Sequence, residues 1–336
     1  MKKNKTIIIA EAGINHNGSL KRAIKMIKIA KECNADFIKF QTAVPSLVVK
    51  KNAKKANYQK TNLNDNETQL NMITKLHLPL SNYKILKDEC KKKSIGFLSS
   101  PFDLKSISYL NSIGCKYVKI PSGEINNYPF LKKIAKYKFK IILSTGMSKL
   151  YEIKDALKIF YKFKIKKQNI ILLHCNSAYP TPYIDVNLSV IESLKNKFNL
   201  EVGFSDHTQG NLAAISAVVL GAKVIEKHFT LNRNLKGPDH QSSLNPKEFK
   251  EMVIQIRNVE TLIGDPLKKV TTSEKENLKI VRKSIVAKID INKGEIFSES
   301  NLTTKRPGTG ISPMKWDLII GTKSKKNYKQ DDFINE

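Results

Sequence analysis

Two short stretches combine histidines with groups able to support metal or acid–base chemistry. Glu226 and His228 interrupt the apolar run VIEKHFT, and Ser205 and His207 end the run EVGFSDHT. Because side chains along a strand alternate between its two faces, each of these pairs shares one face. Two imidazoles from neighbouring strands, with carboxylates close by, favour a labile divalent metal that keeps open coordination positions. The alternative interpretation is that both histidines are structural.

Two lysines lie inside apolar runs, where an ammonium group without a partner is costly to bury. Lys39 occurs in FIKFQT and Lys119 in YVKIPSGE, so an anion-binding role competes with the interpretation that both are solvated surface lysines. Glu11, in IIIAEAG, is a candidate acid or base, or alternatively the partner of a lysine. Together with the lysines, four serines would make a ring of donors for phosphate or carboxylate, namely Ser100, Ser122, Ser144 and Ser205.

These residues all belong to apolar runs that turn polar at their C-terminal ends. The runs are at 7–13, 37–42, 96–103, 117–124, 141–147, 170–182, 201–208 and 224–230. Helix-like segments separate them, which predicts βαβ units and a parallel sheet. Eight units over about 260 residues match a (β/α)₈ TIM barrel, which places all the polar ends at one mouth. A doubly wound sheet is the rival, but EAGINHNG is not a GxGxxG turn.

The predicted organisation is a catalytic barrel at 1–268, a linker at 269–281 and a small β-rich domain at 282–336. The strand-like runs of that domain are SIVAKID, the segment around Leu302, Thr303 and Thr304, and LIIGTKS. Residues 43–80 are polar and predict a long loop over one end of the barrel, with a short helix near 67–76. Ser81 is expected to cap the next helix. Asn245, followed by a proline, is expected to cap a helix that ends near Gly264.

The composition favours a cytoplasmic enzyme. The chain has 336 residues and a formal net charge of +29. Its lysines are spread along the whole length without interleaved aromatic residues, so we expect no nucleic-acid binding. No apolar run approaches the roughly 18–20 residues that a membrane helix needs. The cysteines are scattered, which suits free thiols; they are Cys33, Cys90, Cys115 and Cys175.

Taken in order, ten motifs resemble the bacterial N-acetylneuraminate (sialic acid) synthases and their relatives that make legionaminic and pseudaminic acids. The motifs are IIIAEAGINHNG, FIKFQT, KIPSGE, ILSTGM, LLHCNSAYPTP, GFSDHT, IEKHFT, GPDHQSSL, VRKSIVAKIDINKGE and KRPGTGISP. The resemblance covers nearly the whole chain. It implies a TIM barrel followed by a small antifreeze-like (SAF) domain, and a domain-swapped homodimer in which each small domain caps the partner's barrel.

The resemblance also implies a reaction. Phosphoenolpyruvate condenses with an open-chain N-acylated mannosamine and water, giving a nine-carbon 2-keto acid and phosphate. The cofactor would be a divalent metal on His207 and His228, with Mn²⁺ expected and Mg²⁺ or Co²⁺ as alternatives. Phosphoenolpyruvate would contact Lys39, Lys119, Ser100, Ser122, Ser144, Ser177 and Ser205. The sugar would contact Glu11, Gln41, Glu124, Tyr179, Glu226 and Asp239, with Arg306 reaching the N-acyl group from the partner's small domain.

Several alternatives stay open at this point. The acceptor sugar is N-acetylmannosamine or a related N-acylated mannosamine, or instead a 6-deoxy di-N-acetyl hexose. Another metal-dependent, carbon–carbon bond-forming barrel would explain the histidines but not the KRPG motif. From a different class, a basic nucleic-acid-binding protein would explain the charge but not the inward-facing polar residues.

Overall fold

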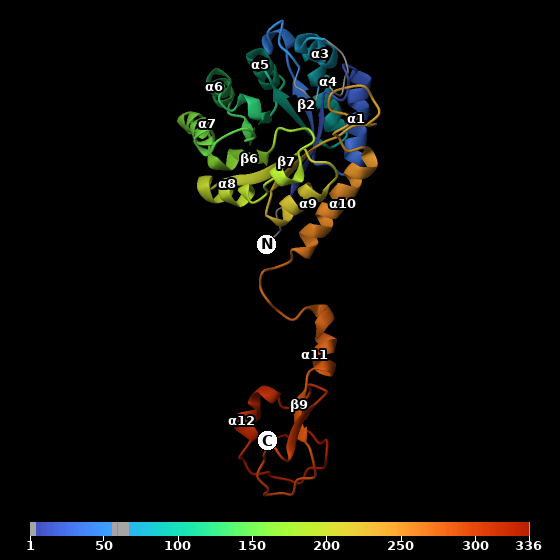
Figure 1. Ribbon diagram of the computed structural model, residues 1–336, viewed down its shortest axis with the longest axis vertical. Helices are drawn as coiled ribbons and strands as arrows, with labels where there is room; N and C mark the ends of the chain where they lie inside the picture. The colour runs from blue at the N-terminus through green and yellow to red at the C-terminus, as the bar shows by residue number, and fades with distance from the viewer. Residues whose placement is uncertain (1–4, 56–58, 60–66, 336) are drawn as a thin grey trace. The chain divides into compact units, whose positions relative to one another are not determined.

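A computed structural model describes residues 5–55, 59 and 67–335 of the chain. It divides the chain into two compact units, Met1–Gly264 and Asp265–Glu336 (Figure 1). The predicted linker at 269–281 therefore lies in the second unit, and its last part is helical, as α11 (Lys275–Val281).

The first unit is a nearly closed barrel of parallel strands. Hydrogen-bonded neighbours follow the order β3-β2-β1-β8-β7-β6-β5-β4, and β3 packs against β4 where the ring closes. The predicted (β/α)₈ architecture is confirmed, and each strand falls inside a predicted apolar run or starts one residue before it. The strands are β1 (Ile7–Gly13), β2 (Phe37–Thr42), β3 (Gly96–Pro101), β4 (Tyr117–Ile120), β5 (Lys140–Ser144), β6 (Ile170–Cys175), β7 (Glu201–Asp206) and β8 (Val224–His228).

Helices surround the strands. They are α1 (Leu20–Glu32), α3 (Gln69–Leu76), α4 (Leu80–Lys92), α5 (Leu104–Ser112), α6 (Tyr128–Tyr137), α7 (Leu150–Lys162), α8 (Val190–Phe198), α9 (Leu212–Val219) and α10 (Pro246–Leu262). At α10, Asn245 and Glu248 form the expected reciprocal capping box. The cap predicted at Ser81 is wrong, because α4 begins one residue earlier and Pro79 holds the cap position. No helix in the described part of the chain is long and apolar enough to cross a membrane.

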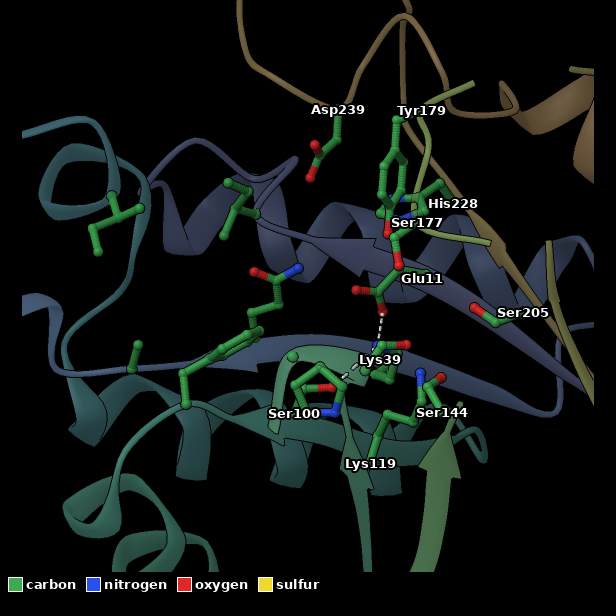
Figure 2. Close-up of a pocket in the computed structure, with 18 of the residues that line it drawn as sticks. Glu11, Lys39, Ser100, Lys119, Ser144, Ser177, Tyr179, Ser205, His228 and Asp239 are labelled. Carbon is green, nitrogen blue, oxygen red and sulfur yellow. Dashed lines mark hydrogen bonds and ion pairs between the residues drawn. The ribbon is translucent and has the colours of Figure 1, made fainter. Parts of the chain in front are cut away.

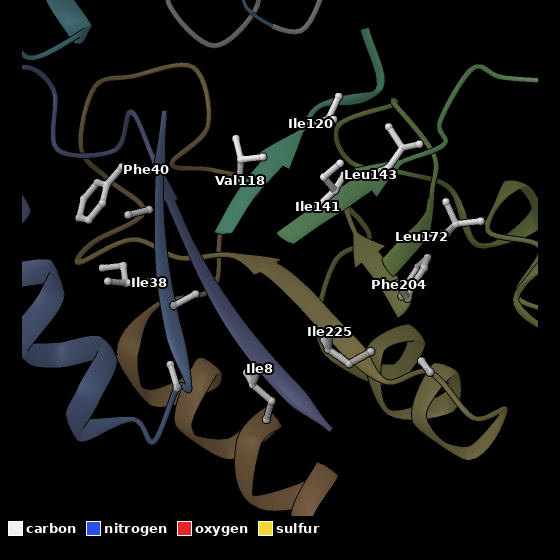
Figure 3. Close-up of a cluster of buried hydrophobic side chains, with 14 of the residues drawn as sticks. Ile8, Ile38, Phe40, Val118, Ile120, Ile141, Leu143, Leu172, Phe204 and Ile225 are labelled. Atoms are coloured by element: carbon white, nitrogen blue, oxygen red, sulfur yellow. The ribbon is translucent and has the colours of Figure 1, made fainter. Parts of the chain in front are cut away.

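Apolar side chains fill both faces of the barrel strands below the mouth. Ile8, Ile38 and Ile225 belong to the core between strands and helices (Figure 3). Ile9, next to Ile8, points the other way into a separate interior layer. That interior layer consists of Ile9, Leu98, Ile142, Leu173 and Val224. Two residues beyond Ile9, on the same strand face, the chain reaches Glu11, so the polar mouth lies directly above an apolar floor.

The second unit has its own small core around the antiparallel strands β9 (Ser284–Ala287) and β10 (Leu302–Lys305). The strand expected at LIIGTKS is wrong. Its start lies in the short helix α12 (Trp316–Ile319), which follows a 3₁₀ turn capped by Ser312.

Candidate active site

A cavity of about 320 Å³ opens at the C-terminal mouth of the barrel. Nearly all the predicted site residues of the first unit line it, as Figure 2 shows for those it labels. They are Glu11, Lys39, Gln41, Ser100, Lys119, Ser122, Ser144, Ser177, Tyr179, Ser205, His207, Glu226, His228 and Asp239. Each of the eight barrel strands supplies one of these residues within two positions of its C-terminal end, which is why segments far apart in the sequence converge here.

Two lysines and two glutamates form a buried charge network at the base of the cavity. Lys39 Nζ lies 3.0 Å from Glu11 Oε2 and 3.5 Å from Glu226 Oε1. Lys119 Nζ donates to the same Glu226 oxygen at 2.8 Å. Each of these side chains is no more than 5% exposed. The pairing offsets the desolvation that makes isolated buried charges unfavourable.

Serine hydroxyls form further hydrogen bonds with this network. Lys39 Nζ donates to Ser100 Oγ at 3.2 Å, and Ser205 Oγ donates to Glu226 Oε1 at 3.0 Å. Figure 2 shows Lys39 between Glu11 and Ser100. The result is two ammonium groups and several hydroxyls that face one small space, the donor set that suits phosphate and carboxylate groups.

The two glutamates of the network have different proton affinities. Burial alone would raise the pKa of Glu226, but Lys119 and Lys39 outweigh it and lower that pKa. For Glu11, burial outweighs the attraction of Lys39, and its pKa is raised. Carboxyl groups whose pKa values are pushed apart in this way suit separate roles, one as a fixed charge and one as a proton carrier.

The two predicted histidines lie side by side, with ring centroids 5.5 Å apart. Tyr179 stacks on His207 at a centroid distance of 4.1 Å and meets His228 edge-on. Burial lowers the pKa of His207 to about 4 and that of His228 well below its usual value. Both rings are therefore neutral near pH 7, which leaves a nitrogen lone pair on each for a metal.

The hydrogen bonds of these rings fit a metal site. His207 Nδ1 lies 2.5 Å from the carbonyl oxygen of Asn176, an acceptor of the kind that orients metal-ligating histidines. His228 Nδ1 is buried and has no hydrogen-bond partner among the described residues. Within the described residues, no three His, Cys, Asp or Glu side chains are grouped to hold a metal. An ion here would therefore complete its coordination with oxygens of substrate or water.

A second cluster of hydroxyls surrounds Gly146. Its N–H donates to Ser122 Oγ at 3.0 Å, and Ser122 Oγ also contacts Cys175 Sγ at 3.2 Å. A Cβ atom at Gly146 would lie 2.8 Å from the hydroxyl oxygens of both Ser122 and Ser177. Only glycine therefore lets these groups approach one another so closely at the cavity wall.

Two predicted site residues lie elsewhere. Glu124 is outside the cavity lining, where its Oε2 accepts a hydrogen bond from Asn127 Nδ2 at 2.6 Å and so supports the turn before α6. Arg306 belongs to the second unit, where it is exposed and its Nε donates to the carbonyl oxygen of Val281 at 2.9 Å.

Sequence reasoning missed one part of the cavity wall. Val48, Val49, Met72, Ile73 and His77 line it, and all five come from the connection between β2 and β3. Apolar residues at irregular spacing carry no chemical signature of their own. The length of that connection was the available signal, since long loops in compact domains are usually functional.

A (β/α)₈ barrel with charged and hydroxylated side chains at the C-terminal mouth defines the class as a barrel enzyme that acts on a small anionic molecule. Residues 26–268 match the NeuB family and residues 282–335 match the SAF domain. The chain belongs to the NeuB family.

Individual relatives are similar over almost their full length. The N,N'-diacetyllegionaminic acid synthase of Campylobacter jejuni subsp. jejuni is 55% identical, across 99% of both chains. The enzyme of the same name from Legionella pneumophila is 43% identical, across 95% of this chain and 90% of that one. The crystal structure of an N-acetylneuraminic acid synthetase from Leptospira borgpetersenii, in complex with citrate, has a TM-score of 0.71 and 35% identity, across 82% of this chain and 90% of that one.

Proposed function

We propose that this protein is a nonulosonate synthase that condenses phosphoenolpyruvate with a 6-deoxy di-N-acetyl hexose and water, giving N,N'-diacetyllegionaminic acid and phosphate. The observation that carries this proposal is 55% identity, across 99% of both chains, to a synthase of that product. The sialic acid synthetase of solved structure is less similar, at 35% identity. N-acetylmannosamine is therefore the second candidate acceptor.

The charge network supports binding of phosphoenolpyruvate. Its phosphate and carboxylate groups would lie against Lys39 and Lys119, with the serine hydroxyls as further donors. The two ammonium groups act in a water-poor site, where their attraction for an anion is stronger than in bulk water. The enol carbon C3 of the substrate would then face the open side of the cavity, toward the sugar aldehyde.

The reaction proceeds in three stages. The enol electron pair forms a bond from C3 to the aldehyde carbon, and the aldehyde oxygen takes up a proton to become a hydroxyl group. Water then adds to the cationic C2 and gives up a proton. Finally the bond from C2 to the phosphate oxygen breaks, phosphate leaves with the electron pair, and the C2 hydroxyl loses its proton to give the ketone.

Glu11 and Asp239 suit the proton transfers in these stages. Burial, followed by the nearby Glu11, raises the pKa of Asp239 to about 7, so its carboxyl group is partly protonated at neutral pH. Groups with a pKa near the working pH are the effective acids and bases. Glu226, with its lowered pKa, would instead remain charged and hold both lysines in place.

His207 and His228 would hold a divalent ion, which we propose is Mn²⁺, with Mg²⁺ or Co²⁺ as alternatives. When bound, such an ion supplies a positive charge that polarises a carbonyl oxygen. Tyr179, whose ring stacks on that of His207 at a centroid distance of 4.1 Å, would hold the ring of His207 in position, while its hydroxyl, 3.1 Å from His207 Nε2, would release that nitrogen to the ion. His228→Ala is expected to lose Mn²⁺ binding, measured by electron paramagnetic resonance, while its circular dichroism spectrum stays that of the wild type.

We further propose a domain-swapped homodimer in the cytoplasm, in which Arg306 of the second unit reaches the sugar's N-acyl group in the partner's barrel. The exposed guanidinium of Arg306 and the free thiols of the described cysteines suit these assignments. Arg306→Ala should raise the KM of the sugar more than that of phosphoenolpyruvate. An unchanged sugar KM, or a monomer in sedimentation, would contradict the capping role.

The central experiment mixes the purified protein with Mn²⁺, phosphoenolpyruvate and one acceptor at a time, and follows phosphate release. The expected result is release with the 6-deoxy di-N-acetyl sugar, with a nine-carbon keto acid of the expected mass as the product. Chelation should abolish it. Absence of release with every acceptor would refute the proposed function.

A further inference from the structure

The cavity has two chemically different sides. Lys119, the serines and Glu226 come from strands β3 to β8 or from the loops after them, whereas Lys39 belongs to β2. Val48, Val49, Met72 and Ile73 line the cavity from the β2–β3 connection. In the ring order, β2 lies opposite β6. The connection that carries the apolar residues begins at the end of β2, on the side of the ring opposite β6. We call these four residues the apolar wall.

The apolar wall is a packed part of the fold. Val48 follows the 3₁₀ turn η1 (Pro45–Leu47), against which α3 packs. Met72 and Ile73 are the buried residues of α3 and are 2% and 8% exposed. Val48 and Val49 are half-buried. A ligand that fills the cavity on this side would meet methyl and methylene groups, beside the amide side chains of Gln59 and Gln69 from the same connection.

His77, at the end of α3, adds one polar group beside the apolar wall. Its Nδ1 lies 2.9 Å from the carbonyl oxygen of Ile73, which can only accept, so Nδ1 carries the proton. Burial lowers the pKa of His77, and the ring is neutral at pH 7. Nε2 is then a buried acceptor with no hydrogen-bond partner among the described residues. It suits an amide N–H.

The positions of the lysines, the histidines and the apolar wall in the cavity determine where each part of the acceptor sugar would lie. If phosphoenolpyruvate occupies the lysines, the aldehyde must lie next to its C3, near Glu11 and the histidines. The far end of the acceptor then extends toward the β2–β3 connection. That end carries hydroxyl groups in N-acetylmannosamine. In a 6-deoxy di-N-acetyl hexose it carries a terminal methyl group and a second acetamido group.

We propose that the apolar wall determines acceptor specificity: Val48, Val49, Met72 and Ile73 receive the methyl-bearing end of a 6-deoxy di-N-acetyl sugar, and His77 Nε2 accepts from its second amide. This inference rests on the proposed function. Methyl groups gain from burial against such a surface, whereas hydroxyl groups there lose water without gaining partners. An apolar pocket rejects an added hydroxyl group by about 100-fold at most.

The test compares kcat/KM for the two acceptors at saturating phosphoenolpyruvate and Mn²⁺. The wild type is expected to favour the 6-deoxy di-N-acetyl sugar over N-acetylmannosamine by about 10- to 100-fold. Val49→Thr keeps the side-chain shape but replaces a methyl group with a hydroxyl group. Met72→Gln keeps the side-chain length but replaces the thioether end with an amide. Each should reduce the ratio of the two kcat/KM values by about 3- to 10-fold, with an unchanged KM for phosphoenolpyruvate.

Matched variants separate specificity from folding. Met72→Leu keeps the apolar wall and should keep the wild-type ratio. Val219→Thr makes the same substitution as Val49→Thr on an exposed helix position outside this cavity, and should also change nothing. If Met72→Gln fails to fold, the half-buried Val49 still carries the test. His77→Asn keeps a donor for the Ile73 carbonyl but removes the Nε2 acceptor, and should raise KM only for the di-N-acetyl sugar.

The outcomes are distinguishable. Phosphate release by the wild type with neither acceptor overturns the proposed function, and this inference with it. An active wild type whose acceptor ratio is unchanged by Val49→Thr and Met72→Gln overturns the inference alone. A wild type that prefers N-acetylmannosamine overturns the inference together with the acceptor named in the proposed function, but leaves the synthase activity standing. An unchanged KM in His77→Asn removes His77 from the specificity site.

Discussion

The two ends of the barrel interior are built on the same strands but have opposite chemistry. Ile9 and Val224 belong to the apolar floor, and two residues further along the same strands come Glu11 and Glu226 of the charge network. The floor stabilises the fold by burying apolar surface. The mouth holds charges whose burial is offset by pairing but gives little net stability. The residues that stabilise the fold and the residues that form the charge network are thus only two positions apart on the same strands.

The sharpest way to break this division is Glu226→Ala. Glu226 Oε1 is the shared partner of Lys119, Lys39 and Ser205. Its removal leaves two buried ammonium groups with only Glu11, so the free energy of unfolding should fall by about 3–5 kcal/mol, measured by urea unfolding. Phosphate release should be lost as well.

The control is Glu201→Ala, at the exposed other end of neighbouring β7. It should leave both stability and turnover near wild type. Full activity in Glu226→Ala would contradict the role given to the charge network.

The floor is tested by Leu173→Ala. Leu173 is fully buried in the apolar interior layer. We expect a loss of about 3–5 kcal/mol in the free energy of unfolding, because the site cannot fully collapse around the cavity. At a temperature where the variant is folded, kcat and both KM values should stay within twofold of the wild type. A large fall in kcat would show that floor and mouth are not separable.

Asp239, in the mouth, is expected to make the stability of the protein depend on pH. Its pKa is raised from 3.8 to about 7 in the folded protein, so the folded state binds the extra proton between these values and stability falls as the pH rises. Asp239→Asn removes the free-energy cost of ionising this buried carboxyl group. The free energy of unfolding should rise by about 4 kcal/mol at pH 8 and by less at pH 5, at about 1.36 kcal/mol per pH unit.

Urea unfolding of both proteins at several pH values measures this difference. Asp185→Asn, at an exposed position, is the matched control and should show no such pH dependence. A gain that is the same at pH 5 and pH 8 would show that Asp239 keeps an ordinary pKa in the folded protein.

The smallest expected effect is that of Ser205→Ala. The variant loses the hydrogen bond to Glu226 Oε1 at 3.0 Å, which contributes about 1 kcal/mol to stability. The kcat/KM for phosphoenolpyruvate should fall by about tenfold, since one donor of the anion site is lost. Steady-state kinetics with varied phosphoenolpyruvate checks this. Ser112→Ala, at the exposed C-terminal end of α5, should change neither value.

Much of the barrel and its mouth was predictable because local signals agreed with the fold. Each strand gave an apolar run, and the period of two placed Glu226 and His228 on one face. A shared mouth for all strand ends then follows from parallel topology alone. Which groups pair there was not predictable. Lys119 and Glu226 are 107 residues apart, and only the closed ring brings them within 2.8 Å.

Two local predictions were wrong because neighbouring residues carried a stronger signal. In LIIGTKS, the apolar and β-branched residues suggested a strand, yet Ser312 and Pro313 just upstream are helix-start signals and α12 follows them. Ser81 matched a cap by residue type, but α4 begins at Leu80 with Pro79 at the cap position. The apolar wall could not be predicted from the sequence, because its role depends on which cavity its residues line, and the tertiary structure determines that.

The arrangement of Lys39 and Lys119 has one more consequence. Each ammonium group has a carboxylate at its side, so Glu11 and Glu226 compete with any incoming anion for the two lysines. An anion that binds there must share the two ammonium groups with these carboxylates. A molecule with two anionic groups, one for each lysine, therefore competes with the glutamates better than a single phosphate ion does.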